Sequence, residues 1–337
     1  MKNQILYRFK KKLANRGVVL MYHQIATPPC DPWQLAVSPE NFEAHLSILK
    51  SDFTVVSLDE MIRNLKGLPL GKRMIAITFD DGFRDNCFTA APLLEKYKMP
   101  ASFYIATKLI NSDGMFWWDM IQHLILYTAK LPEVISITIS DRPFYYELKS
   151  DFLLTDSLRN EISRWNYELP IPNKRVELYY KIWEQLKPLS ITERDEVIKE
   201  LKSWAGESYS SPGFAGVMNV TQLKSLSKNS LFTIGAHTVN HPALAMQTSE
   251  EQIFEIQQSK KILEGWLNKE VNSFAYPYGN YDLMTIKLIN KSGLQNAVTT
   301  AEKPASRYSG FFELPRYQIK NWSGDEFNKQ VSSWLKN

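Results

Sequence analysis

Hydrophobic runs alternate with amphipathic segments along the first third of the chain. Apolar runs of the strand type occur at 17–25, 53–58, 73–79 and 101–107. Segments with helical spacing follow them at 38–52, 57–65 and 86–98. Ser38 and Ser57 occupy N-cap positions, and Pro39 stands at a first helical position. This alternation indicates parallel βα units.

The same alternation returns after residue 230. Strands are predicted at 231–237, 272–279, 296–300 and 313–319, and helices at 249–267 and 281–292. Ser249 and Gln252 predict a capping box for the first of these helices. Residues 115–215 carry instead helical patterns rich in Trp, Tyr and charge. We therefore expect one α/β domain over 1–337, with barrel-like repetition and a helical insertion at 115–215.

Composition and charge narrow the class of protein. The chain has 337 residues, of which 44% are hydrophobic and 23% charged, which is typical of a folded protein. A net charge of +4 with scattered Lys and Arg argues against a nucleic-acid partner. The two cysteines, Cys30 and Cys87, exclude a disulfide framework and a cysteine metal site.

The N-terminal segment is basic and amphipathic, without the apolar core of a secretory signal. We expect a solvated first helix, with peripheral contact to an anionic membrane surface as the alternative. With no long apolar stretch in the sequence, we expect a cytoplasmic protein.

Two adjacent carboxylates, Asp80 and Asp81, follow the apolar run that ends at Phe79. The carboxyl ends of parallel strands are where active sites of α/β folds gather. Two neighbouring carboxylates repel each other, so a bound cation would allow both to stay ionised. The alternative is a structural role, with Asp81 or Asp85 capping the helix predicted near 86–98.

A second group of polar residues follows another apolar strand. His237 and His241 are four residues apart, and two imidazoles at that spacing can meet one ion if the segment makes a helical turn. Together with an aspartate they offer the mixed nitrogen and oxygen ligands that Zn²⁺, Co²⁺, Ni²⁺ or Fe²⁺ accept. A surface turn with incidental histidines is the alternative.

The stretches "TFDDG", "HTVNH" and "FAYPYG" resemble the motifs of the polysaccharide deacetylase (NodB-homology) superfamily, over about 16–110 and 216–320. This resemblance implies an irregular (β/α)7-type barrel and removal of acetyl groups from N-acetylated sugars. It implies that Asp80 is the general base and that Asp81, His237 and His241 hold a divalent metal, usually zinc.

The chain departs from the usual family pattern at two positions. No histidine follows His241, so His23 of "MYHQI" is the candidate acid, as in the permuted subgroup that includes the poly-N-acetylglucosamine deacetylases. Ser273 stands where an arginine usually contacts the base, and Arg316 is the candidate replacement. Tyr278 matches the position whose backbone N–H helps to stabilise the oxyanion.

The resulting hypothesis is a metal-dependent hydrolase that acts on an N-acetylated glycan or its precursor, in the biosynthesis of a surface glycan. Asp80 would accept a proton from the attacking water, and His23 would protonate the leaving amine. A hydrolase of non-sugar amides and an inactive carbohydrate-binding protein are the alternatives. Trp117 and Trp118 of the insertion could stack on a sugar or belong to a core.

Overall fold

The structure is a computed structural model that describes residues 15–67, 73–112, 114–206 and 216–336. Two compact units make up the chain: Met1–Thr27, Leu35–Asn111 and Val217–Asn337 form the first, and Pro28–Gln34 and Ser112–Gly216 form the second. The basic N-terminal segment, with its expected helix and membrane contact, lies outside the described residues. Among the described helices, none combines the length and the apolar character that crossing a bilayer requires.

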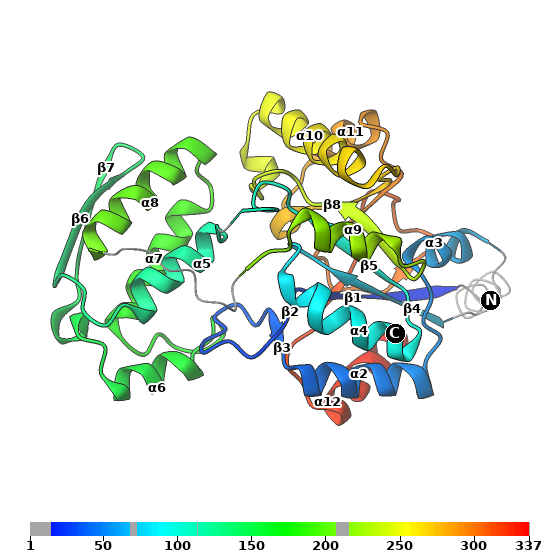
Figure 1. Ribbon diagram of the computed structural model, residues 1–337, viewed down its shortest axis with the longest axis horizontal. Coiled ribbons are helices and arrows are strands. Elements are labelled where there is room, and N and C mark those ends of the chain that lie inside the picture. The colour runs from blue at the N-terminus through cyan, green and yellow to red at the C-terminus, as the bar shows by residue number, and fades with distance from the viewer. Residues whose placement is uncertain (1–14, 68–72, 113, 207–215, 337) are drawn as a thin grey trace, which may run out of the picture. The chain divides into compact units, whose positions relative to one another are not determined.

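The first unit is built on a mainly parallel sheet (Figure 1). Its strands are β1 (Arg16–Tyr22), β4 (Arg73–Phe79), β5 (Ala101–Ile105), β8 (Phe232–Ala236), β9 (Ser273–Ala275), β10 (Asn296–Val298), β11 (Ala305–Ser306) and β12 (Tyr317–Gln318). They lie in the order β10-β9-β8-β5-β4-β1-β11, and β12 also pairs with β1. Only the pairing of β1 with β11 is antiparallel in this sheet as described. A short parallel pair, β2 (Gln24–Ile25) and β3 (Ala36–Val37), follows β1.

The sheet curls into an irregular barrel, as the resemblance predicted. Leu314 forms a parallel bridge with Val298 at one edge of the sheet, and Tyr317 pairs with Leu20 of β1 near the other edge. The segment from Leu314 to Gln318 therefore joins the two sides of the curled sheet. Arg316 lies within this joining segment, which places its side chain beside strands that are far away in sequence.

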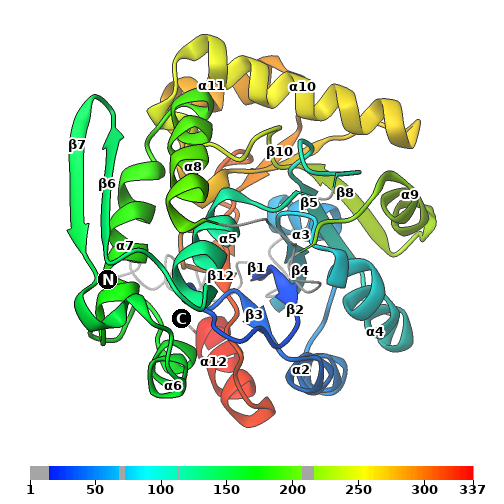
Figure 2. The same ribbon diagram turned by 60° about the vertical axis from the view of Figure 1, so that its left-hand side comes forward.

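Helices surround this sheet (Figure 2). They are α2 (Pro39–Asp52), α3 (Leu58–Lys66), α4 (Ala91–Tyr97), α9 (Val220–Lys228), α10 (Ser249–Leu267), α11 (Leu283–Lys291) and α12 (Gly324–Lys336), with short turns η1 (Asn86–Ala90), η4 (Leu244–Met246) and η5 (Pro277–Gly279). Helices α10 and α11 lie side by side, as do α2 and α12. The strands between them are almost wholly buried, which explains why their sequences read as continuous apolar runs.

Local signals placed most of these elements correctly. Ser38 and Ser57 cap α2 and α3 through their side chains, as predicted. The capping box of α10 is wrong by one residue, because Thr248 and Glu251 form it rather than Ser249 and Gln252. The strand predicted at 53–58 is reduced to a single bridge between Val55 and Ile75.

The second unit combines helices with a hairpin that the helical interpretation did not foresee. Its elements are α5 (Trp117–Gln122), η2 (His123–Tyr127), β6 (Val134–Ile139), β7 (Arg142–Glu147), η3 (Lys149–Phe152), α6 (Asp156–Arg164), α7 (Lys174–Leu186) and α8 (Ile191–Ala205). Trp117 and Trp118 are only 7% and 6% exposed, so these rings belong to the core of this unit. A single domain with an insertion at 115–215 stays a prediction.

A buried arginine organises the loops of the second unit. Arg175 has no exposed surface and donates hydrogen bonds to the carbonyl oxygens of Ile125, Thr128, Asp151 and Phe152. Four carbonyls from two segments, one at η2 and one at η3, thus share one guanidinium, whose planar fork supplies donors in several directions. Arg175 therefore has a structural task within this unit.

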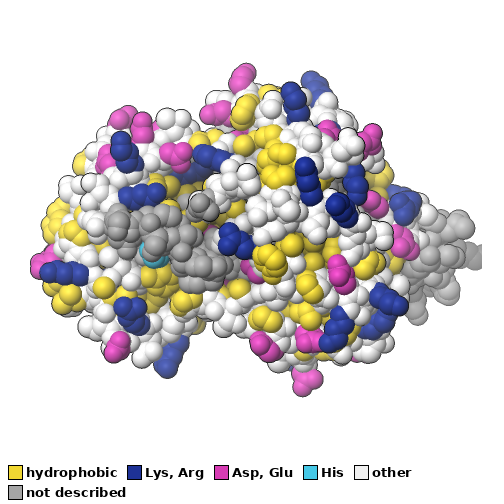
Figure 3. Space-filling view, in the orientation of Figure 1, with side chains coloured by type: hydrophobic (Ala, Val, Ile, Leu, Met, Phe, Trp, Pro, Cys, Tyr) yellow, Lys and Arg dark blue, Asp and Glu magenta, His cyan; other side chains and the backbone are white. Residues whose placement is uncertain are grey.

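Charged side chains are mixed on the surface. Figure 3 shows Lys and Arg scattered among Asp and Glu over the face it presents. This distribution matches the scattered charges of the sequence.

Candidate metal centre and catalytic site

The predicted site residues follow neighbouring parallel strands at the same edge of the sheet. Tyr22 and Phe79 end β1 and β4 and are paired in register, so His23 and Asp80 leave the sheet side by side. Ala236 ends β8 opposite Ile105 of β5, and His237 comes next. Because parallel strands end together, residues about 60 and 150 positions apart converge at this edge.

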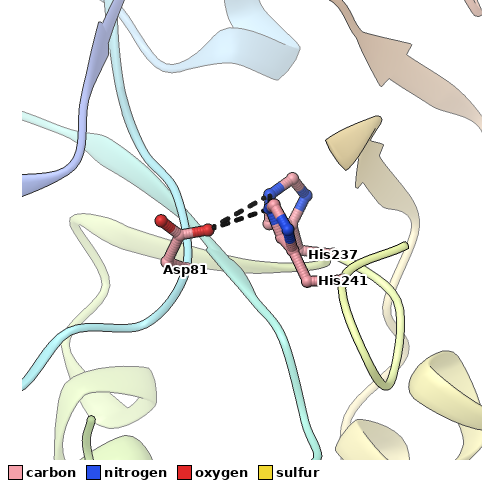
Figure 4. A group of neighbouring side chains, drawn as sticks. All are labelled: Asp81, His237 and His241. Carbon is pink, nitrogen blue, oxygen red and sulfur yellow. Dashed lines mark hydrogen bonds and ion pairs between the residues drawn. The ribbon is translucent and has the colours of Figure 1, made fainter. Parts of the chain in front are cut away.

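Asp81, His237 and His241 form a buried cluster at this edge (Figure 4). Oδ1 of Asp81 lies 3.4 Å from Nε2 of His237 and 3.2 Å from Nε2 of His241. The two Nε2 atoms are 3.1 Å apart. All three residues are at most 5% exposed, so one carboxylate and two imidazoles point at one another away from bulk water.

The donor set of this cluster fits a divalent cation. Nδ1 of His237 lies 2.8 Å from the carbonyl oxygen of Ala275, which can only accept a hydrogen bond. Nδ1 of the neutral ring therefore carries the proton, and the Nε2 lone pair faces Asp81 and His241. Oδ1 of Asp81 is buried without a hydrogen-bond donor among the described residues. Two imidazoles and one carboxylate match the ligand types of zinc and related transition metals.

The pKa values of the three cluster residues also indicate a site for a positive charge. Although burial opposes ionisation, the adjacent imidazoles of His237 and His241 hold the pKa of Asp81 well below its usual range. Burial lowers the pKa of His241 to about 4. Burial also acts against protonation of His237, but Asp81 and Asp80 raise the pKa of His237 above its ordinary value. The cluster therefore attracts one positive charge, which a proton or a metal ion can supply.

The two histidines meet through a strained loop rather than the helical turn that we expected. Thr238 and His241 both have positive φ, at 67° and 56°, a region that non-glycine residues rarely adopt. The His241 N–H donates to the Thr238 hydroxyl at 2.9 Å. Glu255 of α10, 1% exposed, accepts hydrogen bonds from the N–H groups of Val239 and Asn240, both at 2.8 Å. These bonds hold the loop in the conformation that brings both rings to Asp81.

Asp80 faces a different partner from its neighbour Asp81. Arg316 is fully buried and donates from Nη1 to Oδ1 and from Nη2 to Oδ2 of Asp80, both at 2.7 Å. The guanidinium is itself fixed by the carbonyl of Thr299 and the hydroxyl of Thr78. Burial opposes ionisation, yet the charge of Arg316 lowers the pKa of Asp80 below its ordinary value. Asp80 is thus an oriented carboxylate, and the structure places Arg316 where the sequence hypothesis required.

His23 lies at the same edge, with its side chain half-buried. Burial lowers the pKa of His23, while the nearby carboxylates of Asp81 and Asp80 act in the opposite direction. An imidazole that senses both carboxylates, and that keeps some access to solvent, can exchange a proton with a ligand at this edge. The structure therefore brings His23 together with the other predicted site residues.

Tyr278 reaches the cluster from the turn after β9. Its φ is 57°, and its ring packs edge-on against His241 with centroids 4.6 Å apart. The next residue, Gly279, has a φ of 62°, and a Cβ there would lie 2.0 Å from Oγ1 of Thr300. Only glycine fits at position 279, so the turn that holds the ring of Tyr278 against His241 requires it.

Sequence reasoning missed the residues that support the site. Thr78, Glu255 and Thr299 contact Arg316 or the His237–His241 loop, but the sequence around each is typical of an ordinary strand or helix.

The alternative role of Asp85 as a helix cap is wrong, because its side chain makes no capping hydrogen bond. His45 has a structural role, because it is buried and bonded to Tyr22 and to the carbonyl of Trp322. His123 lies in the second unit.

Comparisons with known proteins place this chain among polysaccharide deacetylases. The family model for polysaccharide deacetylases matches residues 67–127 and 202–297. YxkH of Bacillus subtilis, a polysaccharide deacetylase by name, is 31% identical over 113 residues, which are 33% of this chain and 40% of that protein. The poly-beta-1,6-N-acetyl-D-glucosamine N-deacetylase of Staphylococcus aureus is 23% identical over 89% of this chain and 72% of its own length.

Solved structures share the fold. The Streptococcus pyogenes deacetylase PplD superposes with a TM-score of 0.58 at 20% identity, covering 94% of this chain and 99% of that one. IcaB from Ammonifex degensii gives a TM-score of 0.56 at 16% identity, over 96% and 98% of the two chains. The chain thus carries a polysaccharide deacetylase domain, and its relatives include poly-β-1,6-N-acetylglucosamine deacetylases.

Proposed function

We propose that this protein is a metal-dependent hydrolase that removes the acetyl group from an N-acetylated sugar of a glycan. The observation that carries the proposal is the division of labour between two adjacent carboxylates. Asp81 faces two imidazoles in a buried cluster, while Asp80 is held apart by Arg316 at 2.7 Å. This difference supports a role for Asp81 in binding a cation and for Asp80 in accepting a proton.

Asp81, His237 and His241 would hold the cation. A divalent ion held by these residues would supply Lewis-acid chemistry for the acetamide carbonyl and for a water molecule. Three protein ligands suit a catalytic rather than a structural ion, because positions stay open for water and substrate. Zinc is the ion that we propose, on the basis of the two nitrogen ligands and one oxygen ligand.

The side chains of this chain supply the proton transfers. Asp80, kept ionised by Arg316, accepts a proton from the water that attacks the carbonyl carbon. The backbone N–H of Tyr278 donates to the oxyanion of the tetrahedral intermediate. His23 in its protonated form gives a proton to the amine nitrogen as the C–N bond breaks. The products are acetate and a free amino sugar.

The test of this proposal is acetate release from a panel of substrates. β-1,6-linked N-acetylglucosamine oligomers should release acetate and free amine in equal amounts. An O-acetylated glycan, N-acetyl-lysine and a cyclic imide form the rest of the panel, and protein denatured by heat is the blank. Hydrolysis confined to the non-sugar compounds would contradict the proposal in favour of a non-sugar amidase. Sugar binding without turnover by metal-loaded protein would instead indicate an inactive carbohydrate-binding protein.

A further inference from the structure

The backbone around His23 is held by a neighbouring segment. His23 is the single residue between β1 and β2. The N–H of Asp80 donates to the carbonyl of Tyr22 at 3.1 Å, which ties the end of β1 to the segment that carries both site carboxylates. The same segment continues to Asp85 and Asn86, two residues to which neither the metal site nor the proton transfers assign a role.

Asp85 and Asn86 bind the two peptide groups that follow His23, one on each side of Gln24. Nδ2 of Asn86 donates to the carbonyl oxygen of His23 at 2.7 Å, and Oδ1 of Asp85 accepts from the N–H of Ile25 at 2.8 Å. The two side chains are joined to each other by a bond of 2.8 Å from Nδ2 of Asn86 to Oδ1 of Asp85. Together they form a bridge, which we call the Asp85–Asn86 brace.

The hydrogen-bonding groups of this brace point at the protein backbone, with Asp85 half-buried and Asn86 buried. Asn86 has no exposed surface, and it opens the η1 turn ahead of α4. Asp85 precedes that turn without capping it by its side chain. Polar atoms removed from water are costly unless they bind specific partners. Here Nδ2 of Asn86 and Oδ1 of Asp85 bind backbone groups of His23 and Ile25, whereas Oδ1 of Asn86 and Oδ2 of Asp85 are buried without a hydrogen-bond partner among the described residues.

We propose that Asp85 and Asn86 are positioning residues that fix His23 as the proton donor of the reaction. This inference rests on the proposed function. Asp80, Asp81 and the brace belong to one stretch of seven residues, so the brace sets the His23 ring relative to the base and the metal cluster. A displacement of about 1 Å in such a group can reduce turnover by about 100-fold.

Loss or displacement of the His23 proton donor should slow only the step in which the leaving group takes a proton. An amine leaves only as it is protonated, whereas 4-nitrophenolate leaves from 4-nitrophenyl acetate without a proton. We therefore expect His23→Ala to lower kcat by about 100-fold or more for the N-acetylglucosamine oligomer and by less than about threefold for the aryl ester. This variant is the reference for the brace.

Asn86→Ala tests the brace against that reference. We expect kcat for the oligomer to fall by about 10- to 100-fold with KM within about twofold, and turnover of the aryl ester to stay within about threefold. The double variant with His23→Ala should be no slower than His23→Ala alone. Asn15→Ala is the matched control, since Asn15 donates its amide to the carbonyl of Asn64 beside the opposite end of β1, and it should keep both activities.

The outcomes separate this inference from the proposed function. An equal loss on both substrates by Asn86→Ala, or no loss on either, would overturn the positioning role. If His23→Ala itself fails to distinguish the substrates, the acid assignment fails whatever Asn86→Ala does. Should Asn86→Ala not fold, Asp85 provides the same test. Asp85→Asn keeps an oxygen for the Ile25 N–H and should retain oligomer turnover, whereas Asp85→Ala should lose about 10-fold, and equal behaviour of the two would overturn the inference.

Discussion

Asp80→Asn should reduce acetate release by about 1,000-fold or more while the protein still binds its metal. A general base contributes about 10²–10⁴-fold, and the amide of asparagine cannot accept the proton of the attacking water. The ligands Asp81, His237 and His241 are untouched by the substitution, and the closest described partner of Asp80 is Arg316. Activity and metal content are therefore expected to separate.

The measurement pairs steady-state acetate release with elemental analysis of the same purified sample. Asp52→Asn is the matched control, because it makes the same change at an exposed carboxylate of α2 that accepts a hydrogen bond from Asn328, and it leaves the base and the metal ligands in place. Loss of metal in Asp80→Asn would mean that Asp80 contributes to metal binding and is not only the base. Near-normal turnover of Asp80→Asn would rule out Asp80 as the base.

Arg316→Met should destabilise the protein by about 3–5 kcal/mol, because it leaves the charge of Asp80 buried and unpaired. The substitution also removes the hydrogen bonds that Arg316 donates to the carbonyl of Thr299 and the hydroxyl of Thr78. The double variant with Asp80→Asn removes the unpaired charge, so it should be more stable than Arg316→Met alone. Urea unfolding of both, with the slope checked against the wild type, gives the two free energies.

The pH dependence of this deficit has a definite sign. In the wild type the pKa of Asp80 lies below its ordinary value of 3.8, so its ion pair stabilises the fold above that pH and is lost as the pH falls through the lowered pKa. Without Arg316, burial dominates and raises the pKa of Asp80. Protonation then removes the unpaired charge, and the deficit of Arg316→Met should shrink as the pH is lowered towards 4. A deficit that is independent of pH would indicate lost packing rather than an unpaired charge.

The strand ends were the predictable part of the site. Asp80, Asp81 and His237 each follow a run of buried residues, and parallel strands deliver such positions to one edge whatever lies between them. The four-residue spacing of His237 and His241 predicted that their rings could meet one ion, but it did not predict the loop conformation that brings them to Asp81. The positive φ of Thr238 and His241 depends on Glu255, which lies 14 residues beyond His241 and carries no local signal.

Long-range pairing was harder to predict. The contact between Arg316 and Asp80 spans 236 positions and depends on the segment from Leu314 to Gln318 joining both sides of the curled sheet. The departure from the family motif had indicated Arg316 as the replacement arginine, and the register of β12 on β1 shows how its side chain comes to lie beside Asp80. The hairpin of β6 and β7 was missed because the alternation of buried and exposed residues in β6 stood inside a segment dominated by helical patterns.

Removal of the metal tests the central claim most directly. The protein would be stripped with a chelator, shown by elemental analysis to be free of metal, and assayed for acetate release from N-acetylglucosamine oligomers before and after one equivalent of Zn²⁺ is added. We expect the rate to fall to about one hundredth or less of the untreated value and to return on addition of zinc. A sample verified to be free of metal that keeps the untreated rate would contradict the account.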